Sequence, residues 1–453
     1  MKKLFKALAV IGVSAALCAP LAACGDDTAK TEQEKIYDAY VVYAEAAGEE
    51  PLSYEEWLES VQGEKGDKGD KGDKGDKGDK GDQGAAGEDG VGIETVSSVY
   101  TYDAAADAFY TEITFALTDG ASYTAKVPAA EDTSLECVAD SAAEIAALMG
   151  KGFKKIALGA DISLQSFTLS DYDLQLDLNS HTLSVTGAVS SNVTNGSDVT
   201  VKNGTIAASG LRGANAHIIL GENSALTLEK VTYTATGTAI YAQGGNAEVS
   251  VTESTIEAGG YCVGTNASVN SEQTAHLYQN ITVHIANSEF DSDESAVLFN
   301  VPGTLTVENS KLYGEEQAVF LRAGTAEISN STLGTTCVYT DSQDSYLNKD
   351  WKSGNQAPHA ALLVGSRNGT YFADATCTLI GEIKFEMIKG TEAPEIYVYE
   401  SKTGHTGVNN GNPFATKLDY SKATGITSEM IVRGTGTQEV EIIAPAAAAD
   451  EQA

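Results

Sequence analysis

A short unit recurs along the second half of this 453-residue chain, and it limits the fold more than any other feature. Each copy is predicted to form two short strands joined by a tight turn, because apolar and polar residues alternate on both sides of one central position. The copies occupy residues 176–183, 199–206, 226–233, 249–256, 283–290, 305–312 and 326–333. A recurrence of this kind is typical of proteins built from stacked structural repeats.

The position three before the end of each copy is the expected turn. It holds Asn203, Asn287, Asn309 and Asn330 in four copies, and Ser180, Lys230 and Glu253 in the others. Asparagine suits a tight turn because it tolerates a left-handed backbone. We also expect the four asparagines to stack from coil to coil as a hydrogen-bonded ladder.

A further apolar strand precedes several copies, at residues 239–242, 261–264, 296–299, 318–321 and 361–364. Three strands per coil predict a mainly β fold, a right-handed parallel β-helix, and this part of the chain resembles the pectin-lyase-like fold. We assign residues 131–380 to the β-helix, with an amphipathic capping helix at 141–148. Residues 381–445 are expected to close the far edge as a C-terminal β segment, and 446–453 to be a disordered tail.

A run of glycines at every third position, residues 63–90, lies in the first half of the chain. A strict Gly-x-y period is the mark of a collagen triple helix, because only glycine fits at the axis of three wound chains. Proline is absent from the run, and Lys68 of one strand could instead pair with Asp70 of a neighbour. The alternative is a disordered, charge-balanced linker. We assign residues 63–92 to a collagen-like stalk or linker.

The regions beside this run are expected to be small structured modules. Residues 35–62 form a predicted helical segment, with a capping box at Ser53 and Glu56. It is either a two-helix hairpin or a trimer-forming helix, so a homotrimer could form through residues 35–92. Residues 93–130 alternate polar and apolar side chains around a Thr118-Asp119-Gly120 turn. They resemble the small β-hairpin module that follows collagen-like tracts in bacterial surface proteins.

The first 24 residues have a basic start, an apolar core and small residues before Cys24. They resemble a bacterial lipoprotein signal, which implies that residues 1–23 are removed and that Cys24 carries the lipid. The alternative is an ordinary secreted signal with a chance cysteine. We therefore expect a membrane partner through Cys24, a tether at residues 24–34, and a lipid-anchored chain on the outside of a bacterial cell membrane.

Charge and cysteine content restrict the partners. The formal net charge is −35, which repels nucleic acid and predicts no such partner. Four cysteines remain beyond the signal: Cys137, Cys262, Cys337 and Cys377. They allow three disulfide pairings, between which the sequence does not choose. Cys262 lies in an apolar strand pattern and is expected to be a small core residue.

Two insertions flank the apolar third strand, at residues 266–279 and 334–358, as a binding cleft would need. Candidate ligand-binding residues are Tyr346 and Trp351 in the second insertion, and Arg322 at a strand edge. The acidic runs 291–294 and 341–344 could supply oxygen ligands to calcium, but nothing fixes a loop geometry, so we predict no cofactor or metal. The catalytic residues of the resembled enzymes are missing, so we assign no catalytic residue.

These features together predict a lipid-anchored display or adhesion protein. Its β-helix, held on a stalk, is expected to bind an extracellular glycan or protein ligand. One alternative is a polysaccharide-active lyase or hydrolase whose acids come from the insertions. A second alternative is a structural envelope protein.

Overall fold

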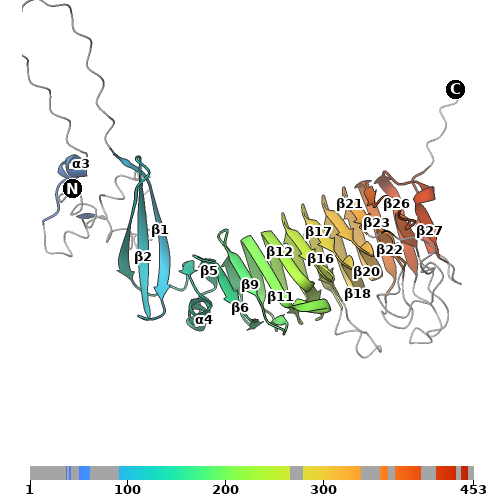
Figure 1. Ribbon diagram of the computed structural model, residues 1–453, viewed down its shortest axis with the longest axis horizontal. Helices are drawn as coiled ribbons and strands as arrows, with labels where there is room; N and C mark the ends of the chain where they lie inside the picture. The colour runs from blue at the N-terminus through green and yellow to red at the C-terminus, as the bar shows by residue number, and fades with distance from the viewer. Residues whose placement is uncertain are drawn as a thin grey trace, which may run out of the picture. The chain divides into compact units, whose positions relative to one another are not determined.

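A computed structural model gives the fold of the chain (Figure 1). It describes residues 37, 40, 41, 50–61, 91–265, 279–336, 338, 358–365, 373–398, 415–434 and 440–446. The chain divides into two compact units, Met1–Val138 and Ala139–Ala453. The described residues of both units form mainly β-strands, and most strands of the second unit run parallel to their neighbours.

The first unit contains the capped helix that the sequence predicts. Helix α3 spans Tyr54–Val61. The Ser53 backbone N–H donates to Glu56 Oε2 at 3.0 Å, and the Glu56 backbone N–H donates to Ser53 Oγ at 3.3 Å, which is a capping box. The buried Trp57 ring stacks on Tyr40 with 6.2 Å between ring centroids, so aromatic contacts join α3 to the helical turn that contains Tyr40.

The first unit also contains an antiparallel sheet of three strands. They are β1 (Ile93–Asp103), β2 (Ala108–Leu117) and β3 (Ser122–Ala129), and β4 (Cys137–Ala139) begins beside β1. Phe109, Ile113 and Phe115 of β2 are buried on one side of the sheet. The predicted turn at Thr118–Gly120 joins β2 to β3, where the Gly120 N–H donates to the Leu117 carbonyl at 2.9 Å.

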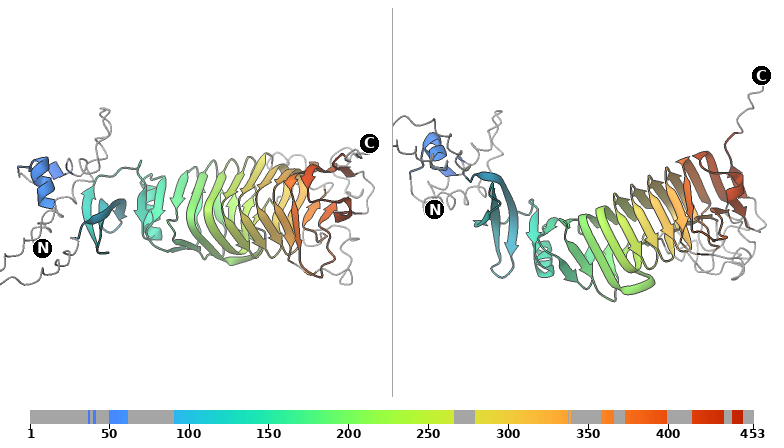
Figure 2. Two further views of the ribbon diagram at one scale, coloured as in Figure 1. Left: turned by 90° about the horizontal axis from the view of Figure 1, so that it is seen from above. Right: turned by 45° about the horizontal axis from the view of Figure 1, so that its top comes forward.

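The second unit is a β-helix-like stack of coils (Figure 2), in which parallel strands form three series. The first series contains β5 (Lys155–Leu158), β8 (Leu174–Asp177), β13 (Glu248–Thr252), β16 (Ile281–Ala286), β23 (Ala375–Glu382), β26 (Thr416–Thr424) and β28 (Val440–Ile443). The second contains β6 (Ile162–Leu164), β9 (Thr182–Val185), β14 (Thr255–Ala258), β17 (Glu289–Ser292), β19 (Lys311–Gly314), β21 (Thr332–Thr335) and β24 (Lys384–Met387). The third contains β7 (Thr168–Ser170), β10 (Ser191–Thr194), β15 (Val263–Gly264), β22 (Leu362–Val364), β25 (Ile396–Val398) and β27 (Ile431–Arg433), the last of which follows the short 3-10 helix η7 (Ser428–Met430).

Four long strands continue through a corner of the coil and so contribute to more than one series. They are β11 (Asp198–Leu220), β12 (Ala225–Ala242), β18 (Ser295–Glu308) and β20 (Gln317–Ser329). Each recurring sequence unit supplies one strand of the first series and one of the second, and the apolar segment before it supplies the third. The coils thus have the three strands per turn that the period predicts.

Helix α4 (Ala142–Gly150) covers the apolar interior at the first coils. Ser141 is its N-cap, and the Ser141 hydroxyl accepts a hydrogen bond from the Glu144 N–H at 3.2 Å. Ile145 and Met149 line an interior cavity of about 110 Å³, together with strand residues such as Leu176. The sequence predicts this helix at residues 141–148, as a cap over the open edge.

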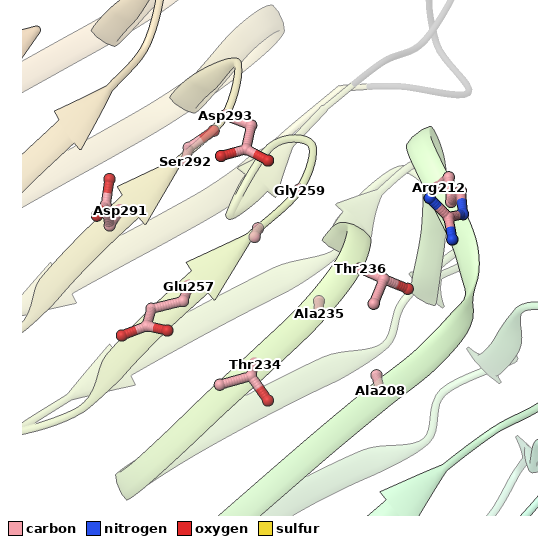
Figure 3. A pocket seen from close by; sticks show the side chains of 11 residues that line it. Ala208, Arg212, Thr234, Ala235, Thr236, Glu257, Gly259, Asp291, Ser292 and Asp293 are labelled. Carbon is pink, nitrogen blue, oxygen red and sulfur yellow. The ribbon is translucent and has the colours of Figure 1, made fainter. Parts of the chain in front are cut away.

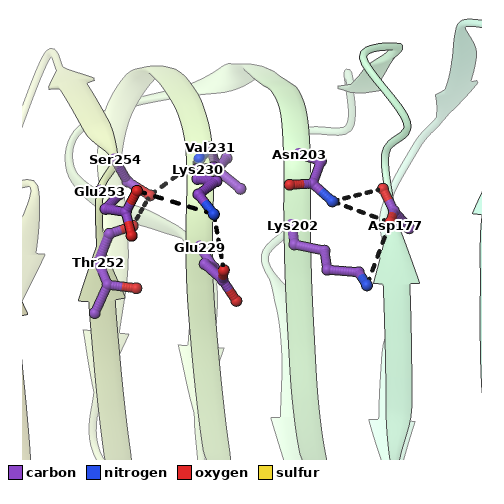
Figure 4. Close-up of polar contacts among 9 residues, drawn as sticks. All are labelled: Asp177, Lys202, Asn203, Glu229, Lys230, Val231, Thr252, Glu253 and Ser254. Atoms are coloured by element: carbon purple, nitrogen blue, oxygen red, sulfur yellow. Dashed lines mark hydrogen bonds and ion pairs between the residues drawn. The ribbon is translucent and has the colours of Figure 1, made fainter.

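The predicted turn position is left-handed in every copy of the repeat. Its φ angle is +60° at Asn203, +54° at Lys230, +49° at Glu253 and +48° at Asn309, and Ser180, Asn287 and Asn330 are also positive. Figure 4 shows this corner, where Lys230 Nζ lies 3.9 Å from Glu253 Oε2 of the next coil. The predicted left-handed turn at this position of the repeat is confirmed.

The side-chain ladder at this corner runs through serines one position later, rather than through the asparagines. The backbone N–H of one serine donates to the hydroxyl of the serine in the next coil at 3.1 Å, along Ser254, Ser288, Ser310 and Ser331. The reason is geometric: Asn287, Asn309 and Asn330 are exposed, whereas the four serines are buried. Asn203 instead donates to Asp177 at 3.0 Å.

An asparagine ladder does exist at a different corner, between the third and first series. Asn246 Nδ2 donates to Asn223 Oδ1 at 2.7 Å, and Asn280 Nδ2 donates to Asn246 Oδ1 at 3.1 Å. All three residues also have a positive φ. The coils in this part of the stack therefore have two left-handed corners each. The sequence predicts only the corner between the first and second series.

Candidate functional site

The outer side of the third series carries an unbroken apolar row, which we call the outer row. Its members are paired in register from coil to coil: Ile219, Tyr241, Gly264, Leu298, Phe320, Leu363, Tyr397 and Val432. Their sequence neighbours form the inner column, because Ile218 lines the interior cavity and pairs in register with Ile240. Side chains alternate along a strand, so the outer row faces away from the interior.

The outer row is nevertheless shielded from water. Phe320 and Tyr397 are each only 1% exposed, and Leu363 is fully buried. These side chains form a cluster of their own, which also includes Ala216 and Tyr261. Outward-facing side chains reach such burial only when other groups of the protein lie against them. The outer row is therefore a second apolar layer outside the coil wall.

The register at Tyr261 differs from the sequence alignment by one residue. The sequence pairs Cys262 with Ile240, whereas the structure pairs Val263 with Ile240 and Gly264 with Tyr241. A one-residue shift moves each side chain to the other face of a sheet. A Cβ at Gly264 would lie 2.5 Å from Tyr241 Cε1, so the absence of a side chain leaves room for the Tyr241 ring. The apolar character of the face, which the sequence predicts, is unaffected.

An acidic corner flanks the outer row on one side, where the second series turns into the third. It consists of Glu294 and Glu316 at equivalent positions of adjacent coils, because the Glu316 N–H donates to the Glu294 carbonyl at 3.0 Å. The Tyr261 hydroxyl acts on the Glu294 carboxylate and lowers its pKa. The Tyr261 ring lies beside Tyr241, with 6.3 Å between centroids, so the corner continues into the outer row.

Burial is the main cause of unusual protonation at the acidic corner. Burial and, to a lesser extent, the charges of Glu294 and Glu315 together raise the pKa of Glu316 to about 7, while Arg322 opposes the shift. Burial also raises the pKa of Glu294, although the hydrogen bond from Tyr261 acts in the opposite direction. The site thus holds two interacting carboxyl groups, one of which is protonated in a large fraction of molecules near neutral pH.

Two polar side chains lie at the other end of these strands. Arg322, the predicted strand-edge residue, is 2% exposed, and its guanidinium lies 4.3 Å from the centroid of the Phe320 ring. Asn300 is fully buried and accepts a hydrogen bond from the Thr265 hydroxyl at 3.0 Å. Within the described residues its Nδ2 has no hydrogen-bond partner. The row is therefore flanked by polar groups on both sides.

An open polar pocket of about 470 Å³ adjoins the acidic corner on the second series (Figure 3). Glu257 and Asp291 are paired in register on its floor, and Asp293 lies next to Glu294 in the chain. Arg212 comes from a segment within β11 and lies at the rim. Carboxylates predominate, so the pocket favours neutral or cationic ligands.

Several predicted site residues lie outside the described part of the chain. These are Cys24, Tyr346, Trp351, Cys337 and the acidic run 341–344. The other acidic run, 291–294, is described, and no group of three or more acidic, histidine or cysteine side chains there or elsewhere in the described residues is arranged to hold a metal ion. Cys137, Cys262 and Cys377 are buried, and the Cys262 thiol donates to the Asp291 carbonyl at 3.2 Å.

The acidic corner is not among the site residues predicted from the sequence, although the repeat contains a signal for it. Glu294 and Glu316 are four residues after Phe290 and Leu312, the last residues of two consecutive copies of the repeat. Acids at equivalent positions of consecutive copies must lie side by side in a stacked coil. Searching the repeat for such pairs would have found them.

No protein family, curated protein or solved structure matches this chain. Among the described residues, no helix has the length and apolar character needed to cross a membrane.

Proposed function

We propose that the chain is a lipid-anchored bacterial surface protein that displays a right-handed parallel β-helix of the pectin-lyase-like type and binds an extracellular carbohydrate. The anchor is Cys24, the spacer is the Gly-x-y tract, and the binding surface is the open polar pocket on the second series together with the acidic corner that it adjoins. The observation that carries the proposal is this open pocket of about 470 Å³, which is lined by carboxylate and hydroxyl side chains and adjoins the acidic corner.

The chemistry of the acidic corner suits a sugar. Tyr241 and Tyr261 are only 4% and 5% exposed, so their rings support the corner from behind and leave the contact with a sugar to the polar side chains. Carboxylates accept hydrogen bonds from sugar hydroxyls, whereas the protonated form of Glu316 can donate one to a ring or glycosidic oxygen. A protein ligand would be the alternative occupant, and the same binding assay separates the two.

Replacing one tyrosine hydroxyl tests the proposal. Tyr261→Phe keeps the buried ring but removes the hydroxyl that acts on the Glu294 carboxylate, so we expect it to weaken binding of a glycan by about tenfold. Tyr313→Phe is the matched control, because Tyr313 also donates to a glutamate, Glu386, at 2.7 Å, but on the second series. The measurement is a glycan array followed by calorimetry on the full-length protein.

The results distinguish the possibilities. If the wild-type protein bound no glycan on the array, carbohydrate binding would be refuted. Equal loss in both variants would show that the acidic corner is not the site. Retention of a protein ligand instead, with the same dependence on Tyr261, would place the adhesion function at this corner and reassign its ligand.

A second candidate function is hydrolysis of a polysaccharide. It is favoured by the two interacting carboxyls, because glycoside hydrolysis uses one carboxylic acid as proton donor and one carboxylate as base or nucleophile. A carboxyl with a pKa of about 7 is suited to donate a proton near neutral pH. Release of reducing ends by the wild-type protein, lost in Glu316→Gln, would establish this function over simple binding.

A further inference from the structure

The small sheet of the first unit has one apolar side. Strand pairing places Val96 opposite Phe115, Phe115 opposite Tyr123, and Ile93 opposite Leu117, so these side chains share a side. A register shift between Ile93 and Thr95 brings Ile93 onto this side. The other side is polar: the Thr114 and Thr124 hydroxyls lie 3.0 Å apart, and Lys126 pairs with Glu112 at 3.1 Å.

The apolar side is buried along its centre, where Phe115 between Val96 and Tyr123 is only 2% exposed, but the side chains around Phe115 near the start of β1 are exposed. Tyr102 and Phe109 are buried where β1 ends and β2 begins. Ile93, Val96 and Tyr123, together with Val91 just before β1, are exposed at the opposite end. We call these four residues the open patch. None of them carries a charge, which sets the patch apart in a chain whose net charge is −35.

The open patch lies where the chain leaves the Gly-x-y tract. The Gly92 N–H donates to Thr118 Oγ1 and the Thr118 N–H donates to the Gly92 carbonyl, both at 2.9 Å. These bonds fix residue 92 against the turn that joins β2 and β3. The last glycine of the period is Gly90, directly before Val91. The open patch and the Gly-x-y tract are therefore adjacent in the chain.

We propose that two further copies of this chain cover the open patch, so that the small sheets form a threefold contact at the end of the Gly-x-y tract. Three chains wound on one axis would leave it within a few ångströms of each other, because a triple helix holds its chains in contact. Their open patches would then already lie close together, so the contact between them would form at a high effective concentration. The threefold contact would hold the three tract ends together and display three solenoids.

Two equally exposed valines provide the test. Val96 is 44% exposed on the apolar side, and Val99 is 45% exposed on the polar side of the same strand. Val96→Asp should lower the association constant at least tenfold in sedimentation of the full-length protein in detergent, whereas Val99→Asp should leave the trimer intact. A monomeric or dimeric wild-type protein, or equal effects of the two variants, would overturn the proposal.

Cysteine cross-linking gives a second measurement that does not depend on a disruptive change. Val96→Cys should form disulfides between chains under mild oxidation, and Val99→Cys should form no more of them than the wild-type protein does. Cross-linking of Val99→Cys alone would place the contact on the wrong side of the sheet and refute the inference. Neither measurement involves a glycan, so failure here is distinct from failure of the proposed function.

Discussion

Replacement of Glu316 by glutamine should change how the stability of the protein depends on pH. The pKa of this carboxyl is about 7 in the folded protein and 4.5 in an unperturbed chain. Below pH 4.5 both states hold the proton. Between pH 4.5 and 7 the unfolded chain loses it first, so ionisation stabilises the unfolded state and the free energy of unfolding falls as pH rises.

The size of the effect follows from the shift in pKa. Each unit corresponds to about 1.4 kcal/mol, so the full difference would cost the wild-type protein about 3 kcal/mol above pH 7. Solvent reaches part of the side chain, which reduces the expected cost to about 2 kcal/mol. Glutamine cannot ionise. Relative to the wild-type protein, Glu316→Gln should therefore gain about 2 kcal/mol between pH 4.5 and pH 8.

Urea unfolding at pH 4.5 and at pH 8, monitored by tryptophan fluorescence and circular dichroism, measures this gain. Glu315→Gln is the control, because it removes a carboxyl from the adjacent, exposed position of the same corner. The comparison of variant with wild type cancels the titration of the other acids. If Glu316→Gln and Glu315→Gln gave the same change within about 0.5 kcal/mol, the reasoning about burial at the acidic corner would be refuted.

Further predictions concern the left-handed corner. Ser288→Ala should cost about 1–3 kcal/mol in urea unfolding, because the buried Ser254 N–H loses its acceptor; a cost below about 0.3 kcal/mol would contradict a structural role of the serine ladder. Asn309→Ala should lower the melting temperature, since a left-handed φ of +48° costs alanine about 1 kcal/mol. Lys230→Gly should raise it by the equivalent of about 0.5 kcal/mol, because glycine adopts the φ of +54° without strain. Changes of the same sign in these two variants would show that backbone strain does not control this corner.

The sequence was sufficient to predict the coil because the repeat combines two local signals. Apolar alternation predicts the strands, and asparagine at a fixed offset predicts a left-handed turn. Lys230 and Glu253 show how strong the period is, since neither residue favours a positive φ and both adopt one. Stacking against adjacent coils therefore overrides local preference. Shape-determined contacts, such as the serine ladder, could not be predicted from residue preference alone.

The candidate site was harder to predict, because it depends on register and on burial. The one-residue shift at Val263 decides whether Tyr261 belongs to the strand or to the corner, and alternation over four apolar residues does not determine it. Burial of Glu316 depends on groups from several coils, which are distant in sequence. Arg322 was identified because it is the one charge in an apolar strand, but its position over Phe320 required the structure.

The charges around the acidic corner also distinguish between the two kinds of polysaccharide chemistry. Elimination by a lyase removes a proton from a carbon beside a carboxyl group, so its substrates are acidic sugars. Three of the four residues 291–294 are acidic: Asp291, Asp293 and Glu294. Their negative charges would repel a polyanionic glycan. A neutral glycan would instead donate its hydroxyls to these carboxylates. If the corner is catalytic, the charges thus favour hydrolysis of a neutral polysaccharide over elimination from an acidic one, and the same preference applies to binding.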